Sequence, residues 1–548
     1  VFHTSFLGWS FRNNSSVSME FGYCGQFDRD EKMIAEWVEE ELDTIDLGDE
    51  RLNVRAKRVL TTLSAAPASS IPAAVGGGRA ETEATYRLFE NHRFGFDELI
   101  EPHIESTLQR IGQESVCVFL QDTTEGDVTR PNQQVVGTGP LDAGARRGCL
   151  IHPIYAFTEN GIPLGPVAVQ IWTREEKEEP KTDLGDEPKK TKQEKEKDRK
   201  KLKARPIEQK ESYRWVEGVN TAHEVAALYP ETHIIIVSDS ESDVFEVLSA
   251  GQIYTGNSLE NDADAEPHAD WIIRACQDRV VVLPEAQKSE AEISQSPDSA
   301  VSHFVYAQVE SAPVMETYTV HVRGRQTKVS CEERERRQPR ESRMATVQVR
   351  ACKIKLKCPQ DRSKILSDVE VNAVLVREVN PPAGDVAIEW LLLTSLPITT
   401  TEEVLYVIQT YCLRWQIEIF FRVLKQGCRI EERLFETLPR LKRYLAIAFI
   451  ISWRTLLLSR LGRETPDVSC EAIFEACEWK AVYQVTQKKL PPEIPPTLGE
   501  IVRMVAQLGG YVNRTKGAYP GPETIWKGIL RMNDLATAWN SFGPGQNE

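Results

Sequence analysis

The feature that most constrains the fold of this 548-residue chain is a change in the spacing of its apolar residues. Between Asp30 and Glu90 apolar side chains recur every three or four residues, which is the spacing of amphipathic helices. Beyond about residue 106 they gather in short runs bounded by turn residues, a pattern typical of buried strands. Helical spacing returns near residue 402 and continues to the end. The chain is therefore predicted to place a mixed α/β core between two helical regions.

The order of these runs narrows the prediction. Three strands are followed by helix, strand, helix, strand, a long strand-rich stretch, strand and helix. This is the order of a ribonuclease H-like α/β core interrupted by a β-strand-rich insertion. The predicted core strands are Val116–Leu120, Cys149–Phe157, Pro163–Trp172, His233–Val237, Asp270–Ala275 and Trp390–Thr394, and the predicted core helices are Ser212–Tyr229, Val244–Ala250 and Glu402–Leu424.

Composition places the expected boundaries between these parts. Residues 1–29 are predicted to be a flexible extension, with Met19 as an alternative start, and residues 30–105 an α-helical domain. The catalytic core is expected at 106–464. It includes a charged surface insertion at 173–211, which has too few apolar residues to order itself, and the β-rich insertion at 277–388. An α-helical C-terminal domain is expected at 465–548.

The amino-acid composition also excludes several classes of protein. Apolar residues make up 41% of the chain, which is ordinary for a globular protein. We find no run of the ~18 consecutive apolar residues that a membrane span needs, and no signal-peptide pattern at the start. The eleven cysteines include no CxxC pair, which favours reduced thiols. A cytoplasmic protein without a membrane partner is therefore predicted.

The net charge of −16 argues against nucleic acid as a partner when the chain is taken as a whole. A DNA-binding face needs only a local excess of Lys and Arg, however. From Phe421 to Arg460 there are nine basic residues and three glutamates, and the helix expected at Glu50–Leu63 has a basic side. Local charge is therefore compatible with DNA binding.

Three acidic residues lie where a metal site can form. Asp122 and Asp239 each follow an apolar strand, at the rim of the sheet where α/β proteins form their sites. Singly, such an aspartate is usually a turn or cap residue, and a polar helix stripe is usually solvated. At ~100° per residue, one stripe of the last core helix falls within about 60°; it contains Tyr411, Arg414, Glu418 and Lys425.

Taken together, these residues favour a metal site beside a phosphate backbone. Three carboxylates supply hard oxygen ligands that can hold two Mg²⁺ ions. Such a pair, ~3.5–4 Å apart, stabilises the attacking and leaving oxygens of an in-line displacement. The phenol and the two cations of the stripe suit binding to DNA phosphates.

At these residues the chain resembles the transposases of the insertion-sequence-four family, of the Tn-five type. The helix stripe matches the family's Y-(2)-R-(3)-E-(6)-K signature at every spacing. The other matching stretches are Asp46–Asn53 with Ser70–Pro72 and Ala84–Phe89, then Gln121–Glu125, and Val237–Asp243. The resemblance covers most of the chain.

The resemblance implies a DDE transposase that cuts and pastes a bacterial insertion sequence by end cleavage, hairpin formation and strand transfer. Asp122, Asp239 and Glu418 would bind two Mg²⁺ ions, for which Mn²⁺ could substitute. The implied partners are double-stranded DNA, namely transposon-end inverted repeats and target DNA, and a second subunit in a homodimer assembled on DNA. The protein would be cytoplasmic and associated with the nucleoid.

Further DNA contacts are implied for residues outside the acidic triad. Tyr411, Arg414 and Lys425 would contact phosphates of the transposon end, and Trp390 would stack on a flipped base. The remaining candidates are basic residues, Arg51 and Arg55 in the N-terminal unit and Arg422 in the basic stretch.

Two features leave alternatives open. Ser240 replaces an arginine common in the family, which makes Glu241 and Asp243 rivals to Asp239 as the second carboxylate. The chain could also be a catalytically inactive, transposase-derived DNA-binding or inhibitor protein. A ribonuclease H-like nuclease that hydrolyses DNA without strand transfer is the other alternative.

Overall fold

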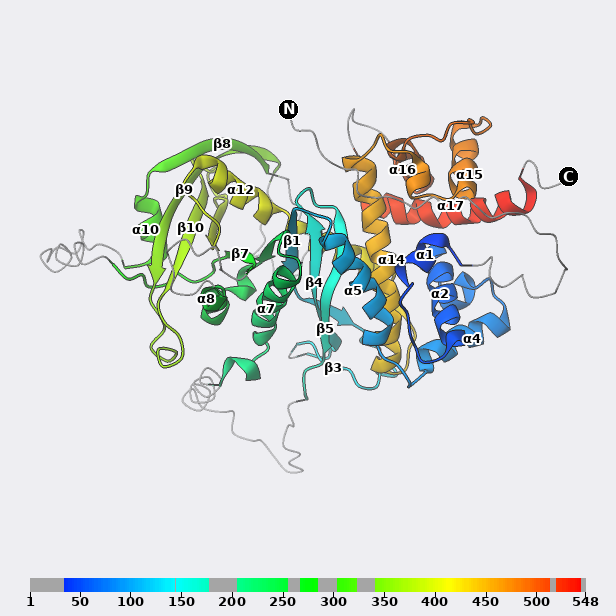
Figure 1. The fold of residues 1–548 in the computed structure, drawn as a ribbon, viewed down its shortest axis with the longest axis horizontal. Coiled ribbons are helices and arrows are strands. Elements are labelled where there is room, and N and C mark those ends of the chain that lie inside the picture. The colour runs from blue at the N-terminus through cyan, green and yellow to red at the C-terminus, as the bar shows by residue number, and fades with distance from the viewer. Residues whose placement is uncertain are drawn as a thin grey trace, which may run out of the picture.

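The structure is a computed structural model that describes residues 34–142, 144–176, 205–254, 267–283, 303–322, 341–512 and 519–543. A central sheet separates a strand-rich lobe from two groups of helices, one from each end of the chain (Figure 1). The extension at 1–29, most of the charged insertion expected at 173–211 and parts of the β-rich insertion lie outside the described residues.

Five strands form the core of the sheet, in the spatial order β5-β4-β1-β6-β7. β1 (Val116–Gln121) and β6 (His233–Ser238) pair in parallel, and β6 pairs in parallel with β7 (Asp270–Arg274). On the other side of β1, β4 (Arg147–Thr158) runs antiparallel to it and pairs with β5 (Pro163–Trp172). These are the order and directions of a ribonuclease H-like core, so the predicted fold class is confirmed.

The strand that carries Asp122 is longer than the sequence indicates. β2 (Thr124–Asp127) continues β1 after two residues and pairs with β4 in the same register. β6 pairs with β1 only as far as Ser238, which lies opposite Gln121. Asp122 therefore lies inside a long strand, at the point where the neighbouring strand ends.

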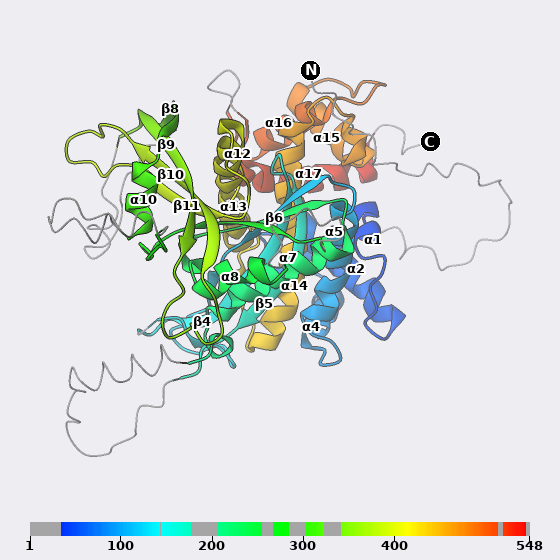
Figure 2. The ribbon, with the colours of Figure 1, turned by 60° about the vertical axis from the view of Figure 1, so that its left-hand side comes forward.

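The β-rich insertion extends the same sheet. The predicted core strand β11 (Glu389–Thr394) pairs antiparallel with β7, and the strands of the insertion, β10 (Val369–Glu378), β9 (Arg343–Leu356) and β8 (Val314–Val322), follow outward, all antiparallel. Over the described residues the sheet has eleven strands. Figure 2 shows the strands of the insertion standing at one end of the sheet, away from the terminal helices.

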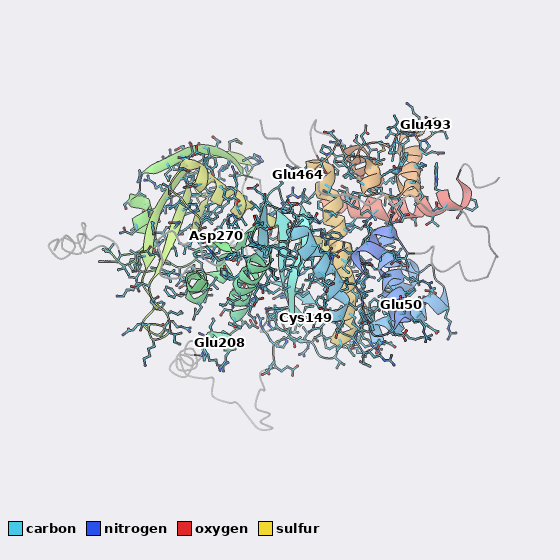
Figure 3. The ribbon with its side chains drawn as sticks, viewed as in Figure 1. Glu50, Cys149, Glu208, Asp270, Glu464 and Glu493 are labelled. Carbon is cyan, nitrogen blue, oxygen red and sulfur yellow. The ribbon has the colours of Figure 1, made fainter. Side chains whose placement is uncertain are left out.

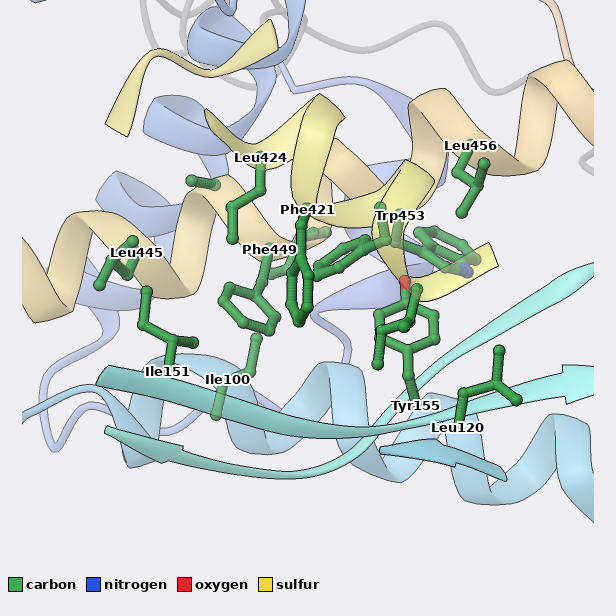
Figure 4. Close-up of a cluster of buried hydrophobic side chains, with 14 of the residues drawn as sticks. Ile100, Leu120, Ile151, Tyr155, Phe421, Leu424, Leu445, Phe449, Trp453 and Leu456 are labelled. Atoms are coloured by element: carbon green, nitrogen blue, oxygen red, sulfur yellow. The ribbon is translucent and has the colours of Figure 1, made fainter. Parts of the chain in front are cut away.

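Alternate residues of the strands face two different hydrophobic cores, because side chains alternate along a strand. Cys117 and Phe119 belong to the core under α7 (Tyr213–Leu228) and α8 (Phe245–Tyr254). Val118 and Leu120 belong to the core on the opposite face. Figure 4 shows that this second core also contains Tyr155, Phe421, Phe449 and Trp453.

Helix α14 (Leu438–Glu464) runs through the middle of the molecule and contacts the sheet at β5 as well as both groups of terminal helices (Figure 1). It is long and apolar enough to cross a membrane, with a mean hydropathy of 1.5 over 18 residues, but 83% of that window is buried in the protein. Its apolar surface is therefore that of a core helix.

The N-terminal helices are α1 (Glu36–Glu41), α2 (Glu50–Ala65), α3 (Ile71–Ala74), α4 (Arg79–Glu90) and α5 (Asp97–Ile111). Two buried arginines bind this group to the core by donating to backbone carbonyls. Arg443 donates to the carbonyl oxygens of Phe89 and Phe94 at 3.1 and 2.7 Å. Arg433 donates to the carbonyl oxygen of Pro67 at 2.5 Å. Two of the nine cations counted as a DNA-facing excess thus serve the interior of the protein.

The C-terminal helices are α15 (Ala476–Gln487), α16 (Leu498–Leu508) and α17 (Pro522–Phe542). A capping box of Thr497 and Glu500 begins α16, because each side chain accepts from the other residue's backbone N–H. The Asn533 side chain donates to the Ala65 carbonyl at 3.1 Å, so α17 also contacts the end of α2.

The helix predicted over Glu402–Leu424 is wrong as one continuous element. It is divided into α12 (Thr401–Cys412) and α13 (Trp415–Arg422), followed by a π-helical turn at Val423–Gly427. At the break, Leu413 and Arg414 donate to carbonyls three residues back instead of four. This part of the sequence contains neither glycine nor proline before Gly427, so local residue preferences do not reveal the break.

Candidate active site

Strand register places two of the predicted carboxylates side by side. Gln121 and Ser238 are paired in the parallel ladder of β1 and β6, so Asp122 and Asp239 are the next residue of each strand. Adjacent strands lie ~4.8 Å apart. Each aspartate follows by two residues a side chain of the core under α14, Leu120 or Val237. Because side chains alternate along a strand, both aspartates face the same side of the sheet as that core. In Figure 3, Cys149 marks the part of β4 that pairs with β2.

Each aspartate also accepts a hydrogen bond from a nearby backbone N–H. The Oδ1 atom of Asp122 accepts from the Thr123 backbone N–H at 2.8 Å. The Oδ1 atom of Asp239 accepts from the Glu241 N–H at 2.8 Å and begins a short 3₁₀ turn, Ser240–Ser242. One oxygen of each carboxylate is thereby oriented by the backbone.

The third carboxylate comes from helix α13, and Arg414 links it to the first. The Arg414 guanidinium donates to Asp122 Oδ2 at 3.3 Å and to Glu418 Oε1 at 2.8 Å. The side chains of Asp122, Arg414 and Glu418 are 16%, 14% and 35% exposed. Arg414 thus balances two carboxylates that would otherwise repel each other.

The charges around Asp122 shift its pKa. It is raised to about 7, first by burial and then by the Asp239 carboxylate, with a further contribution from Glu418. The Thr123 N–H and the Arg414 guanidinium lower the pKa in opposition. The Asp239 and Glu418 carboxylates therefore both act electrostatically on Asp122.

The carboxylates of Asp122, Asp239 and Glu418 do not surround one common point in this conformation. Within the described ranges, no three Asp, Glu, His or Cys side chains are gathered closely enough to hold a metal ion as they stand. Arg414 occupies a position between Asp122 and Glu418. The chemistry of the donor set nevertheless fits a hard divalent cation, because its members are carboxylate oxygens whose negative charges are only partly balanced.

The rest of the stripe lies on either side of α13, with Tyr411 near the end of α12 and Lys425 in the π-helical turn. Tyr411 is 6% exposed, and its pKa is raised by burial, while the charge of Arg414 lowers it in opposition. Lys425 lies in the π-helical turn and pairs with Glu431 at 3.3 Å. Glu431 in turn accepts from the Asp127 N–H at 3.2 Å, so Lys425 lies beside β2.

Trp390, the second residue of β11, packs against Tyr411. Its ring centroid lies 6.1 Å from that of Tyr411, at an interplanar angle of 58°. It is half-buried at the margin of the core under α14. The indole is therefore close to the helix stripe.

The two rival carboxylates have other partners. Asp243 is fully buried, pairs with Arg279 at 2.7 Å and accepts from the Cys276 and Gln277 N–H groups. Glu241 is 63% exposed and pairs with Arg214 at 3.0 Å. These contacts favour Asp239 over both rivals.

The other basic candidates lie on the surface. Arg51 is 94% exposed at the start of α2. Arg55 pairs with Glu81 of α4, and Arg422 is exposed at the end of α13.

Sequence reasoning missed a polar network on the opposite face of the sheet. Thr123 Oγ1 accepts from Arg214 Nε at 2.9 Å and shares a hydrogen bond of 2.9 Å with His152 Nδ1. His152 is fully buried, and burial, together with the nearby Arg214 charge, lowers its pKa to about 3. Gln121 extends the network to Ser238 at 3.3 Å. These contacts join separate elements, so periodicity and local motifs contain no signal for them.

A mixed sheet of this order, with two aspartates side by side where β1 and β6 part, defines a ribonuclease H-like domain. Three family models match the chain: Transposase DNA-binding at 34–94, Transposase DDE domain at 247–454, and Transposase Tn5 dimerisation domain at 450–538. The chain belongs to the Tn5-type DDE transposases. It is a cut-and-paste DNA transposase whose DNA cleavage and strand transfer depend on a divalent metal, and which binds DNA and forms dimers.

The matches do not reach every residue of the site. The range matched by the DDE model includes Glu418 but begins after Asp122 and Asp239. One solved structure, titled a piggyBac transposase synaptic complex with hairpin DNA, is 10% identical with a TM-score of 0.30, over 95% of this chain and 81% of that chain. A likeness of that size carries no argument.

Proposed function

We propose that Asp122, Asp239 and Glu418 are the catalytic carboxylates of this transposase, and that they hold two Mg²⁺ ions, for which Mn²⁺ can substitute. The observation that carries the proposal is the register of β1 and β6, which makes the two aspartates neighbours, together with the Arg414 contacts from Asp122 to Glu418. Bound divalent ions would activate the attacking oxygen and stabilise the leaving one.

The residues around the triad are proposed to hold the scissile strand. Arg414 already bridges two carboxylates, and a guanidinium of this kind can donate two parallel bonds to a phosphate. Tyr411 lies next to it, and Lys425 lies beside β2 at the far end of the stripe. Arg422 on α13, and Arg51 and Arg55 on α2, are proposed to contact the DNA backbone.

We also propose the roles of the domains, the sequence of reaction steps and the location of the protein in the cell. We infer that residues 30–105 bind the terminal inverted repeats of a bacterial insertion sequence, that 106–464 form the catalytic domain, and that 465–548 pair two subunits on the DNA. The reaction sequence would be end cleavage, hairpin formation and joining to target DNA, in the cytoplasm at the nucleoid. Each step is an in-line phosphoryl transfer, so one set of carboxylates serves all of them.

Metal removal and strand joining test this function together. With Mg²⁺, DNA carrying the element's ends should be cut and give hairpin ends on a denaturing gel. EDTA should stop the reaction, and Mn²⁺ should restore it. A pre-cut 3′-OH end should become joined to a target plasmid. Cleavage without any joined product would indicate a nuclease, and binding without cleavage would indicate an inactive DNA-binding protein.

Trp390 is proposed to stack on a base flipped from the duplex when the hairpin forms. Base stacking is worth ~1–3 kcal/mol, so Trp390→Ala should slow hairpin formation by roughly 5- to 150-fold while leaving the first nick close to wild type. Rates of the two steps can be read from one denaturing gel series. If both steps slow equally, the packing of Trp390 on Tyr411 is its only role.

A further inference from the structure

The acidic site is supported from behind by a single guanidinium. Asp122 faces α13, whereas the neighbouring Thr123 faces α7, because side chains alternate along a strand. Arg214 of α7 donates to Thr123 Oγ1 at 2.9 Å and to Glu241 Oε2 at 3.0 Å. It therefore touches the residue after the first aspartate and the turn that follows the second.

Arg214 is largely buried and has further partners besides Thr123 and Glu241. Its side chain is 12% exposed, and its guanidinium lies over the Trp215 and Trp172 rings at 5.0 and 5.6 Å. A third nitrogen, Nη1, donates to the Glu211 carbonyl at 2.6 Å. A side chain with so many partners has little freedom to move, so it can fix the position of Thr123 relative to the turn that contains Glu241.

Thr123 is fixed from a second direction by buried groups. His152 is its cross-strand partner in the shared register of β1, β2 and β4, and its Nδ1 atom lies 2.9 Å from Thr123 Oγ1. The imidazole packs edge-on against Trp215 at 4.7 Å, which is the ring that also supports Arg214. The hydroxyl of Thr123 is thus the point where both supports meet.

We propose that Arg214, acting through the Thr123 hydroxyl and Glu241, is a positioning residue that sets the separation of Asp122 and Asp239. The inference rests on the proposed catalytic triad. Lysine cannot replace Arg214 here, because a single ammonium cannot reach two acceptors in the geometry of the planar guanidinium. Residues that orient metal ligands in this way typically change metal affinity by 10- to 100-fold when they are altered.

Mn²⁺ binding, measured by electron paramagnetic resonance on the full chain without DNA, tests the inference independently of activity. Thr123→Val replaces the hydroxyl with a methyl group of similar size and should weaken Mn²⁺ binding by about 10- to 100-fold. Thr123→Ser keeps the hydroxyl and should bind like wild type. Arg214→Lys should weaken binding at least as much as Thr123→Val does, because it disturbs the contacts with both Thr123 and Glu241. The double variant should bind no more weakly than Arg214→Lys alone, because the Thr123 contact is already lost in that variant.

Arg343→Lys is the matched control. Arg343 has a similar exposure of 14% and also bridges two side-chain acceptors, here the Glu378 and Asp385 carboxylates of the insertion. Its replacement should lower the melting temperature without changing Mn²⁺ affinity. Wild-type binding by Thr123→Val and Arg214→Lys, or an equal loss in Thr123→Ser, would overturn the inference. Asp122→Asn separates the two proposals: if it too binds Mn²⁺ normally, the triad itself is wrong.

Discussion

Replacing Glu418 with glutamine should leave a protein that binds DNA but cuts it at least about 1000-fold more slowly, because loss of a metal-stabilised charge costs several kcal/mol of barrier. An amide is a poorer ligand than a carboxylate for a hard dication. The change keeps the size and shape of the side chain on α13, so folding should be little affected. Single-turnover cleavage of end DNA and an electrophoretic binding assay measure the two properties.

Glu464→Gln is the control for this experiment. Glu464 is 30% exposed and pairs with an arginine four residues earlier, Arg460, as Glu418 pairs with Arg414. Its replacement should leave cleavage unchanged. Normal cleavage by Glu418→Gln, or a loss of DNA binding to match the loss of cleavage, would contradict the role proposed for Glu418.

The largest effect on stability is expected from Glu41→Gln. Glu41 is 6% exposed and accepts two hydrogen bonds from Arg110, both at 3.0 Å, and shares another with the fully buried His103. These contacts join α1 to α5. Removing one partner of a buried ion pair leaves the other charge without compensation, which costs about 3–5 kcal/mol. Urea unfolding followed by tryptophan fluorescence should show the loss.

A neighbouring glutamate on the same helix serves as the control. Glu39 is 48% exposed and pairs with Lys57 at 2.6 Å. Exposed pairs contribute about 0–1 kcal/mol, so Glu39→Gln should unfold close to wild type. Equal unfolding curves for Glu41→Gln and Glu39→Gln would show that the buried cluster contributes little.

The same cluster predicts loss of stability in acid. Burial alone would raise the pKa of Glu41, but His103 and Arg110 lower it from 4.5 to about 2. A lowered carboxyl pKa stabilises the fold above pH 4.5, and this contribution is lost as pH falls toward 2. Burial lowers the pKa of His103, so protonation below pH 6.5 favours unfolding too. The difference in stability between wild type and Glu41→Gln should therefore narrow as pH falls from 4.5 toward 2.

Much of the core could be predicted because each of its strands has a recognisable apolar run in the local sequence. The apolar runs of β1, β4, β5, β6 and β7 each show strand character within a few residues, and their order is that of the fold. Asp122 and Asp239 could be proposed for the same reason, since each directly follows such a run. The insertion could be predicted to be strand-rich, but its place as an extension of the core sheet depends on the pairing of β11 with β7.

The details of the site could not be predicted in this way. The break between α12 and α13 occurs without glycine or proline at Leu413 and Arg414, and it depends on contacts made after folding. The basic stretch from Phe421 to Arg460 suggests a DNA surface, yet Arg433 and Arg443 are buried and bind carbonyl oxygens of the N-terminal region. Charge counted along a sequence does not distinguish a phosphate contact from an internal one.

The sequence alone determined which residues can perform the chemistry: two aspartates after strands, and a helix stripe with the spacing of Tyr411, Arg414, Glu418 and Lys425. Only the tertiary structure decided how they are held. Arg414 and Asp122 are 292 residues apart in the chain, and Arg214 and Thr123 are 91 apart. Hydrophobic periodicity reports what each segment buries locally, whereas an ion pair between distant segments exists only once the sheet and helices have packed.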